Sequence, residues 1–109
     1  MINVKLYFVD DHLYRFTVNG HAEFAEHGSD IVCAGVSALV INTINSIEHF
    51  IDENIVMKNM NKSSGVIDCF FPDIKKGKYN EQTTILLQSM VFGLQNLEQV
   101  YGDYIKIKI

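Results

Sequence analysis

Alternation of apolar and polar residues marks the first two elements of the chain. An apolar side chain stands at every second position from Ile2 to Phe8, which predicts a half-buried strand over residues 2–9. Residues 13–18 are rich in aromatic and β-branched side chains and predict a second strand, joined to the first as a hairpin through the turn at residues 10–12. Asn19 and Gly20 end this strand, so the next residue is expected just past a strand terminus.

A polar loop and then a long helix are expected next. Residues 22–29 show no usable period and predict a surface loop. Apolar residues then recur at spacings of three and four from Ile31 to Ile51, and Ser29 or Asp30 can supply the N-cap oxygen. Polar residues gather in the second half of this helix, so we expect its first half to be the more deeply buried.

The rest of the chain predicts two further strands, a second helix and a last strand. Residues 53–60 and 66–71 predict a hairpin around "NKSSG", closed by Pro72, and "PDIKKGKYN" is expected to be a polar connector. Helical spacing predicts a helix over residues 81–101 that stops at Gly102, and "DYIKIKI" alternates as a strand. The order β-β-α-β-β-α-β predicts an α+β fold, with a mostly antiparallel sheet packed with two helices.

Length and charge narrow the classes of function. A chain of 109 residues is expected to be a single domain, residues 1–109. The N-terminus has no pattern of a signal peptide, and no apolar run approaches the length of a membrane span, so we expect a cytoplasmic protein that does not associate with membranes. The net charge is -4 and the lysines are scattered, with "KKGK" as their one cluster, which predicts no direct nucleic-acid binding.

His21 and Cys33 are the candidate catalytic pair. A thiolate at the start of a helix is stabilised by unsatisfied backbone amides and by the helix dipole. With Asp30 as the cap, Cys33 would be the third helical residue, and the amides of Cys33 and Ala34 could hold an oxyanion. His21 could act as the base if the loop between them folds back over the helix start. Ser37 lies one turn after Cys33 on the same face and could hydrogen-bond near the site.

The other cysteine and histidines are weaker candidates. Cys69 falls on the alternating apolar positions of "VIDCFF" and is expected to be a buried strand thiol. His12 lies in a turn and His49 on the polar side of the first helix, and neither has a predicted partner. His27, in the expected loop, is the one rival base. The cysteines lack the paired spacing of a structural zinc site, so we expect no metal and no cofactor.

The spacing of His21 and Cys33 is also compatible with two residues that have no catalytic role. A single cysteine early in an apolar helix is often a small core residue, and a lone histidine near a turn is often a surface side chain. Cys33 and His21 therefore need support from outside their spacing.

The segment that holds this pair resembles a family motif. Here "GHA" is followed by "SDIVCAGVSAL", which is similar to the pattern of the ribosomal-processing cysteine protease family, also called Prp or YsxB-like proteins. The matching positions are Gly20, His21 and Ala22, then residues 30–34, then Val36 and Ser37. Near the C-terminus, "GLQNLEQVYGDYIKI" resembles the final helix and strand of the family, with Gly102 where members often carry proline. The resemblance covers essentially the whole chain.

The resemblance implies a cysteine endopeptidase that removes the short N-terminal extension of a bacterial large-subunit ribosomal protein during ribosome assembly, cutting after paired aromatic residues. It implies that Cys33 is the nucleophile and His21 the base, and that the protein is a homodimer. Gly20, Asp30, Ala34 and Ser37 are then expected to support the site. The predicted loop, which joins the pair, is the candidate substrate lid: Ala22, Glu23, Phe24, Ala25, Glu26, His27, Gly28 and Ser29.

Two other classes of function stay open at this point. The chain could be a non-catalytic module that binds a ribosomal protein or the assembling ribosome, with the motif retained for packing. It could also be a thiol redox protein, although it lacks a CxxC pair. That function would require Cys69 to lie near Cys33 as a resolving thiol.

Overall fold

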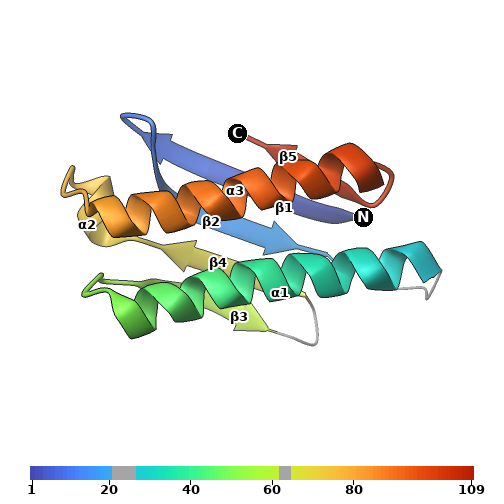
Figure 1. Cartoon of the computed structure of the whole chain (residues 1–109), viewed down its shortest axis with the longest axis horizontal. Coiled ribbons are helices and arrows are strands. Elements are labelled where there is room, and N and C mark those ends of the chain that lie inside the picture. Colours follow the sequence, from blue (N-terminus) through green and yellow to red (C-terminus); the bar gives the residue numbers. More distant parts are fainter. Residues whose placement is uncertain (21–26, 62–64) are drawn as a thin grey trace.

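Five strands form one sheet, and two long helices cover one of its faces (Figure 1). The computed structural model describes residues 1–20, 27–61 and 65–109, with the backbone alone for residues 27–30. In chain order the elements are β1 (Ile2–Val9), β2 (His12–Asn19), α1 (His27–Phe50), β3 (Val56–Asn61), β4 (Val66–Phe70), α2 (Pro72–Lys75), α3 (Glu81–Tyr101) and β5 (Ile105–Lys108). The predicted α+β fold and the order of its main elements are confirmed.

The sheet has the order β3-β4-β2-β1-β5. All neighbouring strands are antiparallel except β1 and β5, which are parallel. Asp10 and Asp11, which connect β1 to β2, have φ angles of 47° and 62°. Left-handed backbone at both positions is the conformation of the tight turn that matches the twist of a hairpin. The predicted first hairpin is thus confirmed.

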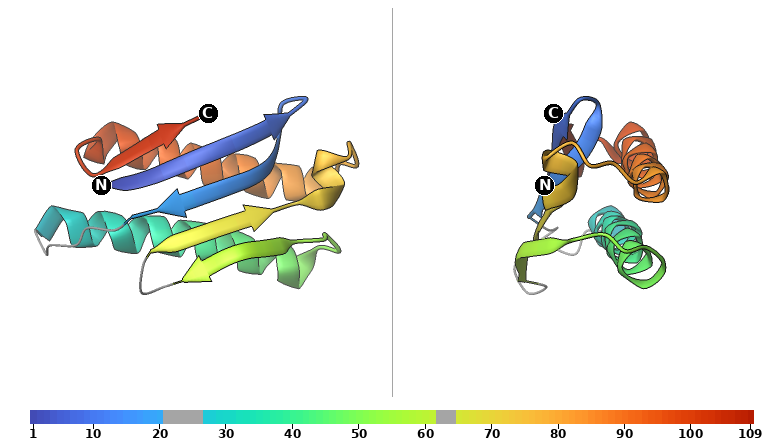
Figure 2. Two further views of the ribbon diagram at one scale, coloured as in Figure 1. Left: turned by 180° about the vertical axis from the view of Figure 1, so that it is seen from behind. Right: turned by 90° about the vertical axis from the view of Figure 1, so that its left-hand side faces the viewer.

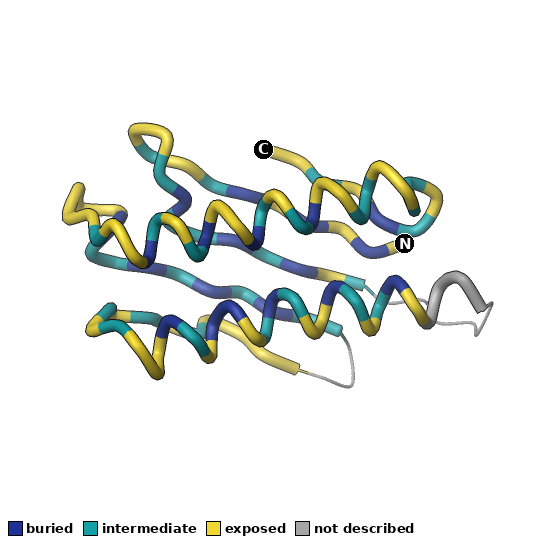
Figure 3. The backbone as a smooth tube through the Cα atoms, viewed as in Figure 1, coloured by how far each residue is buried: buried dark blue, intermediate teal, exposed yellow. Residues whose placement is uncertain are grey.

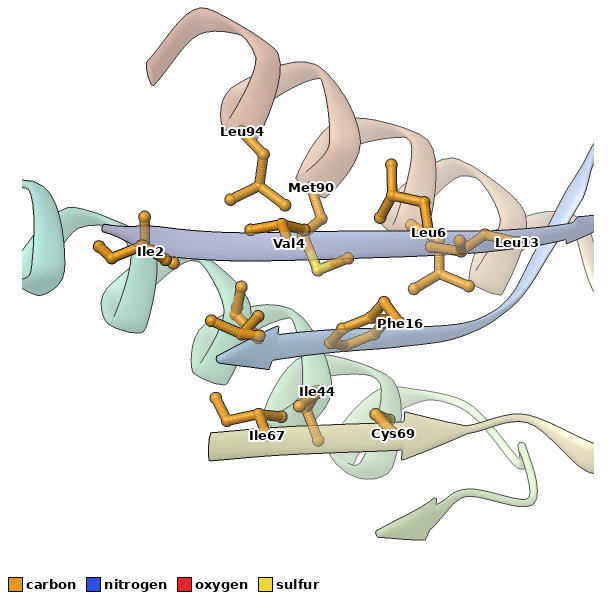
Figure 4. Packing of buried hydrophobic residues seen from close by; sticks show 14 of the residues in the cluster. Ile2, Val4, Leu6, Leu13, Phe16, Ile44, Ile67, Cys69, Met90 and Leu94 are labelled. Atoms are coloured by element: carbon orange, nitrogen blue, oxygen red, sulfur yellow. The ribbon is translucent and has the colours of Figure 1, made fainter. Parts of the chain in front are cut away.

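The hydrophobic core lies between the sheet and the two long helices. Figure 4 shows side chains from β1, β2 and β4 meeting those of α1 and α3, among them Phe16, Met90 and Leu94, all 0% exposed. The buried positions form a stripe along each helix on the side that faces the sheet (Figure 3). Burial of this apolar surface is the main stabilising contribution to such a fold.

Helix α3 follows the sequence-based prediction. It spans Glu81–Tyr101, and the Oδ1 atom of Asn80 accepts hydrogen bonds from the backbone N–H groups of Gln82 at 2.8 Å and Thr83 at 3.2 Å. This N-cap satisfies donors that have no partner within the helix. The helix ends at Gly102 as predicted, with a φ of -59°, a value that proline also adopts.

The expected polar connector after β4 contains a helix. Residues Pro72–Lys75 form α2, with the proline in its first turn. Proline lacks an N–H group, but the first turn of a helix does not need one. Ile74 is 2% exposed, so this short helix contributes an apolar side chain to the core. The prediction of a purely polar connector is wrong because one buried side chain is enough to fold the segment back on the sheet.

Helix α1 differs from the prediction in its start and in its burial. It begins at His27, four residues before the predicted start. Its buried stripe runs from Val32 to Ile47, both 0% exposed, so the expectation that the first half is more deeply buried is wrong. The reason is that the helix lies along the sheet, and polar residues of its second half occupy the outward face.

The composition of α1 also bears on membrane association. Residues Ile31–Phe50 have a mean hydropathy of 1.5 and are long and apolar enough to cross a membrane by length and composition. The expectation that no segment approaches that length is therefore wrong. A core helix passes the same test, and the buried stripe of α1 packs on the sheet, where its apolar residues already have protein partners.

Candidate active site

Buried residues of α1 before and after Cys33 hold this part of the helix against the core. The side chain is half-buried and packs against the core, and its neighbours along the helix, Val32 and Val36, are 0% and 2% exposed. A Cβ added to Gly35 would lie 3.8 Å from a methyl group of Leu97, so α1 and α3 approach closely here. The backbone around Cys33 is thus anchored by buried contacts, as a positioned nucleophile requires.

The prediction that Cys33 is the third residue of its helix is wrong. With α1 beginning at His27, Cys33 is its seventh residue and Asp30 its fourth, so neither Ser29 nor Asp30 is the N-cap. Only the first four amides of a helix lack partners within it, and the dipole effect fades within the first turn. In this conformation the amides of Cys33 and Ala34 belong to the helix interior and cannot serve as the predicted oxyanion donors.

Gly20 occupies a backbone position that only glycine fits. Its φ is +91°, and a Cβ there would overlap the carbonyl oxygen of Met1. The left-handed conformation and the close approach each exclude other residues. Gly20 therefore lets the chain leave the end of β2 beside the N-terminus, directly before His21.

The remaining predicted site residues are only partly described. His21 and residues 22–26 lie outside the described residues, so the pairing of His21 with Cys33 stays a prediction. His27, Gly28 and Ser29, expected in the loop, have helical backbone in α1, and for these three the prediction of a loop is wrong. Ala34 and Ser37 are exposed, and Ser37 follows Cys33 by one helical turn, as expected.

Cys69 is a buried strand thiol, as predicted. It lies in β4 and is 0% exposed, within the core (Figure 4). Burial, with smaller contributions from Asp68 and Glu48, raises the pKa of its thiol to about 12. A protonated and inaccessible thiol cannot attack a disulfide. This weakens the redox alternative, which needs Cys69 as a resolving thiol.

His12 has partners that the sequence did not predict. Its ring stacks on that of Tyr79 with centroids 3.6 Å apart and planes 1° apart. The hydroxyl of Tyr79 donates to Oδ2 of Asp10 at 3.2 Å, and Nδ1 of His12 lies 2.8 Å from the carbonyl oxygen of Asp10. Desolvation and Asp10 raise the pKa of Tyr79. The cluster ties the β1–β2 turn to the chain before α3 and contains no thiol nucleophile.

An apolar cavity of about 240 Å³ lies between the β1–β2 hairpin and α3. Leu13, Leu87 and Phe92 are among its lining residues, and none of the predicted site residues is. Within residues 1–20, 27–61 and 65–109, no group of three or more His, Cys, Asp or Glu side chains is arranged to hold a metal ion. The chemistry that the described residues offer near the motif therefore centres on Cys33.

Comparisons with known proteins also indicate cysteine-based chemistry. The family model described as cysteine protease Prp matches residues 1–106. A ribosomal processing cysteine protease Prp from Bacillus subtilis (strain 168) is 29% identical over 98 residues, which cover 90% of this chain and 87% of that protein. A protein of the same name from Staphylococcus aureus (strain Mu50 / ATCC 700699) is 31% identical over 90 residues, covering 83% and 80%.

Solved structures share the whole fold. The essential ribosomal processing protease Prp from S. aureus, in complex with a substrate peptide, has a TM-score of 0.87 at 28% identity, covering 99% of this chain and 98% of that one. A structure of the S. aureus protease with a covalently linked product peptide gives 0.86 at 29% identity, with the same coverage. SMU.848 from Streptococcus mutans gives 0.86 at 28% identity, covering 100% and 93%.

Proposed function

We propose, on the premise that the chain belongs to the cysteine protease Prp family, that it is a single-domain endopeptidase that processes a ribosomal protein. Its substrate is the short N-terminal extension of a bacterial large-subunit ribosomal protein, cut after paired aromatic residues during ribosome assembly. The observation that carries the proposal is the match of the family model over residues 1–106. The relatives named ribosomal processing proteases, one of them in complex with a substrate peptide, support the choice of substrate class.

Cys33 and His21 are the proposed catalytic dyad. The Cys33 thiolate attacks the scissile carbonyl carbon, His21 protonates the departing amine, and a water molecule activated by neutral His21 hydrolyses the thioester. The half-buried position of Cys33 on an anchored helix suits this role better than the buried Cys69 does. A relative with a covalently linked product peptide supports a mechanism that passes through an enzyme-bound intermediate.

The proposed lid links the two catalytic residues. It comprises residues 22–29, and its last three have helical backbone in α1. We propose that an extended apolar peptide orders the lid and shortens α1 to a start near residue 30. Free amides would then stand close to Cys33 and hold the oxyanion. Hydrogen exchange on a Cys33→Ala variant tests this: peptide should slow exchange in residues 22–26 and speed it in residues 27–33, and no change in either segment contradicts the proposal.

Cleavage of a peptide with an aromatic pair tests the proposed activity. Wild-type protein should cut after the pair, whereas Cys33→Ala and His21→Ala should each lose activity by about 10³-fold or more. A peptide with both aromatic residues replaced by alanine is the control for specificity. Absence of cleavage by the wild type would favour the non-catalytic ribosome-binding module, and cleavage by either variant at the wild-type rate would exclude the dyad.

The outer face of the helix layer supports the proposed homodimer. Residues 31–47 of α1 and 82–97 of α3 contain no charged side chain, and Ile85 and Phe92 are 60% and 66% exposed. An exposed surface that is depleted of charged residues is typical of the centre of a protein interface. Phe92→Glu should therefore convert a dimer to a monomer in analytical ultracentrifugation, with Lys76→Glu as the control. A cytoplasmic location is proposed because that is where ribosomal proteins assemble.

A further inference from the structure

Among the described residues, no helix or strand covers the face of the sheet opposite the long helices, which is the open face. Figure 2 shows the bare sheet from behind and, in the edge view, both long helices on the same side. On β1 the buried residues alternate with Asn3, Lys5 and Tyr7, so these three side chains point away from the core. Strand register carries the same face to Lys106 and Lys108 of β5, which pair with Asn3 and Lys5.

A β-bulge adds a second aromatic residue to this face. Tyr7 pairs with Arg15 and Phe8 with Leu13, so Tyr14 has no partner on β1. The extra residue of a bulge lets two consecutive side chains share one face. Tyr14 and Arg15 accordingly both lie on the open face, while Leu13 is buried in the core.

Three partly exposed aromatic rings form a row across the central strands. Tyr7 of β1 and Tyr14 of β2 have ring centroids 6.2 Å apart, and Tyr14 and Phe70 of β4 have centroids 6.3 Å apart. Phe70 pairs with Arg15 in the sheet register and therefore shares its face. An exposed row of aromatic rings on an open sheet is a surface on which flat groups can stack.

At least one cation lies over every ring of this row. Lys5 and Arg15 lie over Tyr7 at 5.1 Å and 4.9 Å from its centroid. Lys75 lies 4.2 Å from the centroid of Tyr14, and Lys58 lies 5.1 Å from that of Phe70.

With the two lysines of β5, these residues place six of the nine Lys and Arg side chains of the chain on the open face. In the described part of the chain, Asp68 is the one acid that the register places there, and it is paired with Arg15 at 2.8 Å. The face is therefore strongly positive, although the whole chain has a net charge of -4.

We infer that the open face of the sheet binds single-stranded RNA. Lysines at its rim can form ion pairs with the phosphates, and the rings of Tyr7, Tyr14 and Phe70 can stack with unpaired bases. This departs from the sequence-based expectation of no direct nucleic-acid binding, which depended on lysines that are scattered along the chain. Folding gathers them on one face. The inference deepens the proposed function, on which the choice of RNA rests, because a protease for a ribosomal protein works where RNA is abundant.

Charge disfavours a second copy as the occupant of this face. Two copies related by a twofold axis would oppose two positive surfaces, which is unfavourable. An acidic protein could form ion pairs with the lysines but would leave the aromatic row without stacking partners. RNA satisfies both features, and the proposed dimer face lies on the opposite layer of the molecule.

Binding of a fluorescent oligouridine tests the inference. Wild-type protein should bind with an affinity that falls as salt rises, because each phosphate contact releases a counterion. Lys106→Gln/Lys108→Gln should weaken binding and lower the slope of log K against log salt by about 1.4, if each lysine meets one phosphate. Lys76→Gln/Lys78→Gln, which removes the same charge from the chain between α2 and α3, is the matched control and should bind like the wild type.

Loss of an aromatic ring should have a different signature. Tyr7→Leu and Phe70→Leu keep an apolar side chain on the strand but remove the stacking surface, and each should weaken binding about tenfold with little change in salt slope. Phe50→Leu, at an exposed position at the end of α1, is the matched control.

Three results would overturn the inference. They are no binding of oligouridine at about 100 µM protein, equal losses in the test and control variants, and equally tight binding of poly-glutamate, which would identify an acidic protein as the partner. Peptide cleavage by the same variants separates this inference from the proposed function. We expect cleavage to be unchanged, because none of the substituted residues belongs to the proposed catalytic machinery. If cleavage is absent in the wild type while RNA binds, the proposed protease function fails and the RNA-binding face stands.

Discussion

Cys33 and Cys69 are the two cysteines of the chain, and their surroundings make them chemically different. Cys33 is half-buried on α1 within the family motif, whereas Cys69 is 0% exposed in β4, within the core. Burial raises the pKa of the Cys69 thiol to about 12, so this residue behaves as a small apolar side chain. The comparison teaches that position in the fold, and not residue type, selects the candidate nucleophile.

The largest expected difference between the two cysteines is in peptide cleavage. Cys33→Ala should reduce kcat/KM by about 10⁴-fold, since it removes the nucleophile. Cys69→Ala should retain activity within about threefold, because the change is confined to the core. Rates are measured with the aromatic-pair peptide, and circular dichroism checks that both variants fold. A folded Cys69→Ala variant without activity would contradict the assignment of the two thiols.

Alkylation of the native protein should also distinguish the two thiols. Iodoacetamide should modify Cys33 readily and Cys69 about 10³-fold more slowly, because access to a core thiol requires opening of the structure. Mass spectrometry of peptides after timed quenching measures both rates. Denaturant should make the two rates similar. Equal rates in the native protein would mean that Cys69 is not shielded.

The stability of the protein at alkaline pH should depend on Cys69. The pKa of its thiol rises from 9.0 to about 12 on folding, so the folded state keeps a proton that the unfolded state loses above pH 9. The contribution of this thiol to the free energy of unfolding is therefore complete below pH 9 and decreases by about 1.4 kcal/mol per pH unit up to pH 12.

Urea denaturation of the wild type and Cys69→Ala at several pH values measures this effect. The difference between the two free energies of unfolding should be constant below pH 9 and should shrink above it. A Cys33→Ala variant is the control. A difference that stays constant through the alkaline range would show that the thiol ionises equally in both states.

The smallest expected difference is in serine substitutions at neutral pH. Cys69→Ser places a hydroxyl group in an apolar core and should lower the free energy of unfolding by about 2 kcal/mol. Cys33→Ser, at a half-buried position, should change it by about 0.5 kcal/mol or less. The midpoints of denaturant unfolding measure both. Comparable losses would indicate that Cys33 is packed as tightly as Cys69.

Local pattern was sufficient for most of the fold. The alternation of β1 and the helical spacing of α3 are properties of neighbouring residues, and the elements agree with them. The start of α1 was not predicted correctly, because Ser29 and Asp30 suit a cap and also the first turn of a helix. The buried Ile74 of α2 could not be foreseen from a segment whose other residues are polar.

The candidate site was predictable only in part. The spacing of His21 and Cys33 permitted a dyad but did not distinguish it from a packed cysteine and a surface histidine, and the family resemblance favoured the dyad. The position of Cys33 within α1 removed the predicted oxyanion donors. The stack of His12 on Tyr79 had no signal in the sequence, because it joins residues from distant parts of the chain.

The sequence by itself determined the order of the strands and main helices, and the motif that places the chain in its family, because both depend on residues close together in the chain. Tertiary structure decided two other properties: the point at which α1 begins, and the positive aromatic face formed by Tyr7, Tyr14, Phe70 and their lysines. Burial and strand register bring these about. Both are relations between distant segments, and they exist only once the sheet has formed.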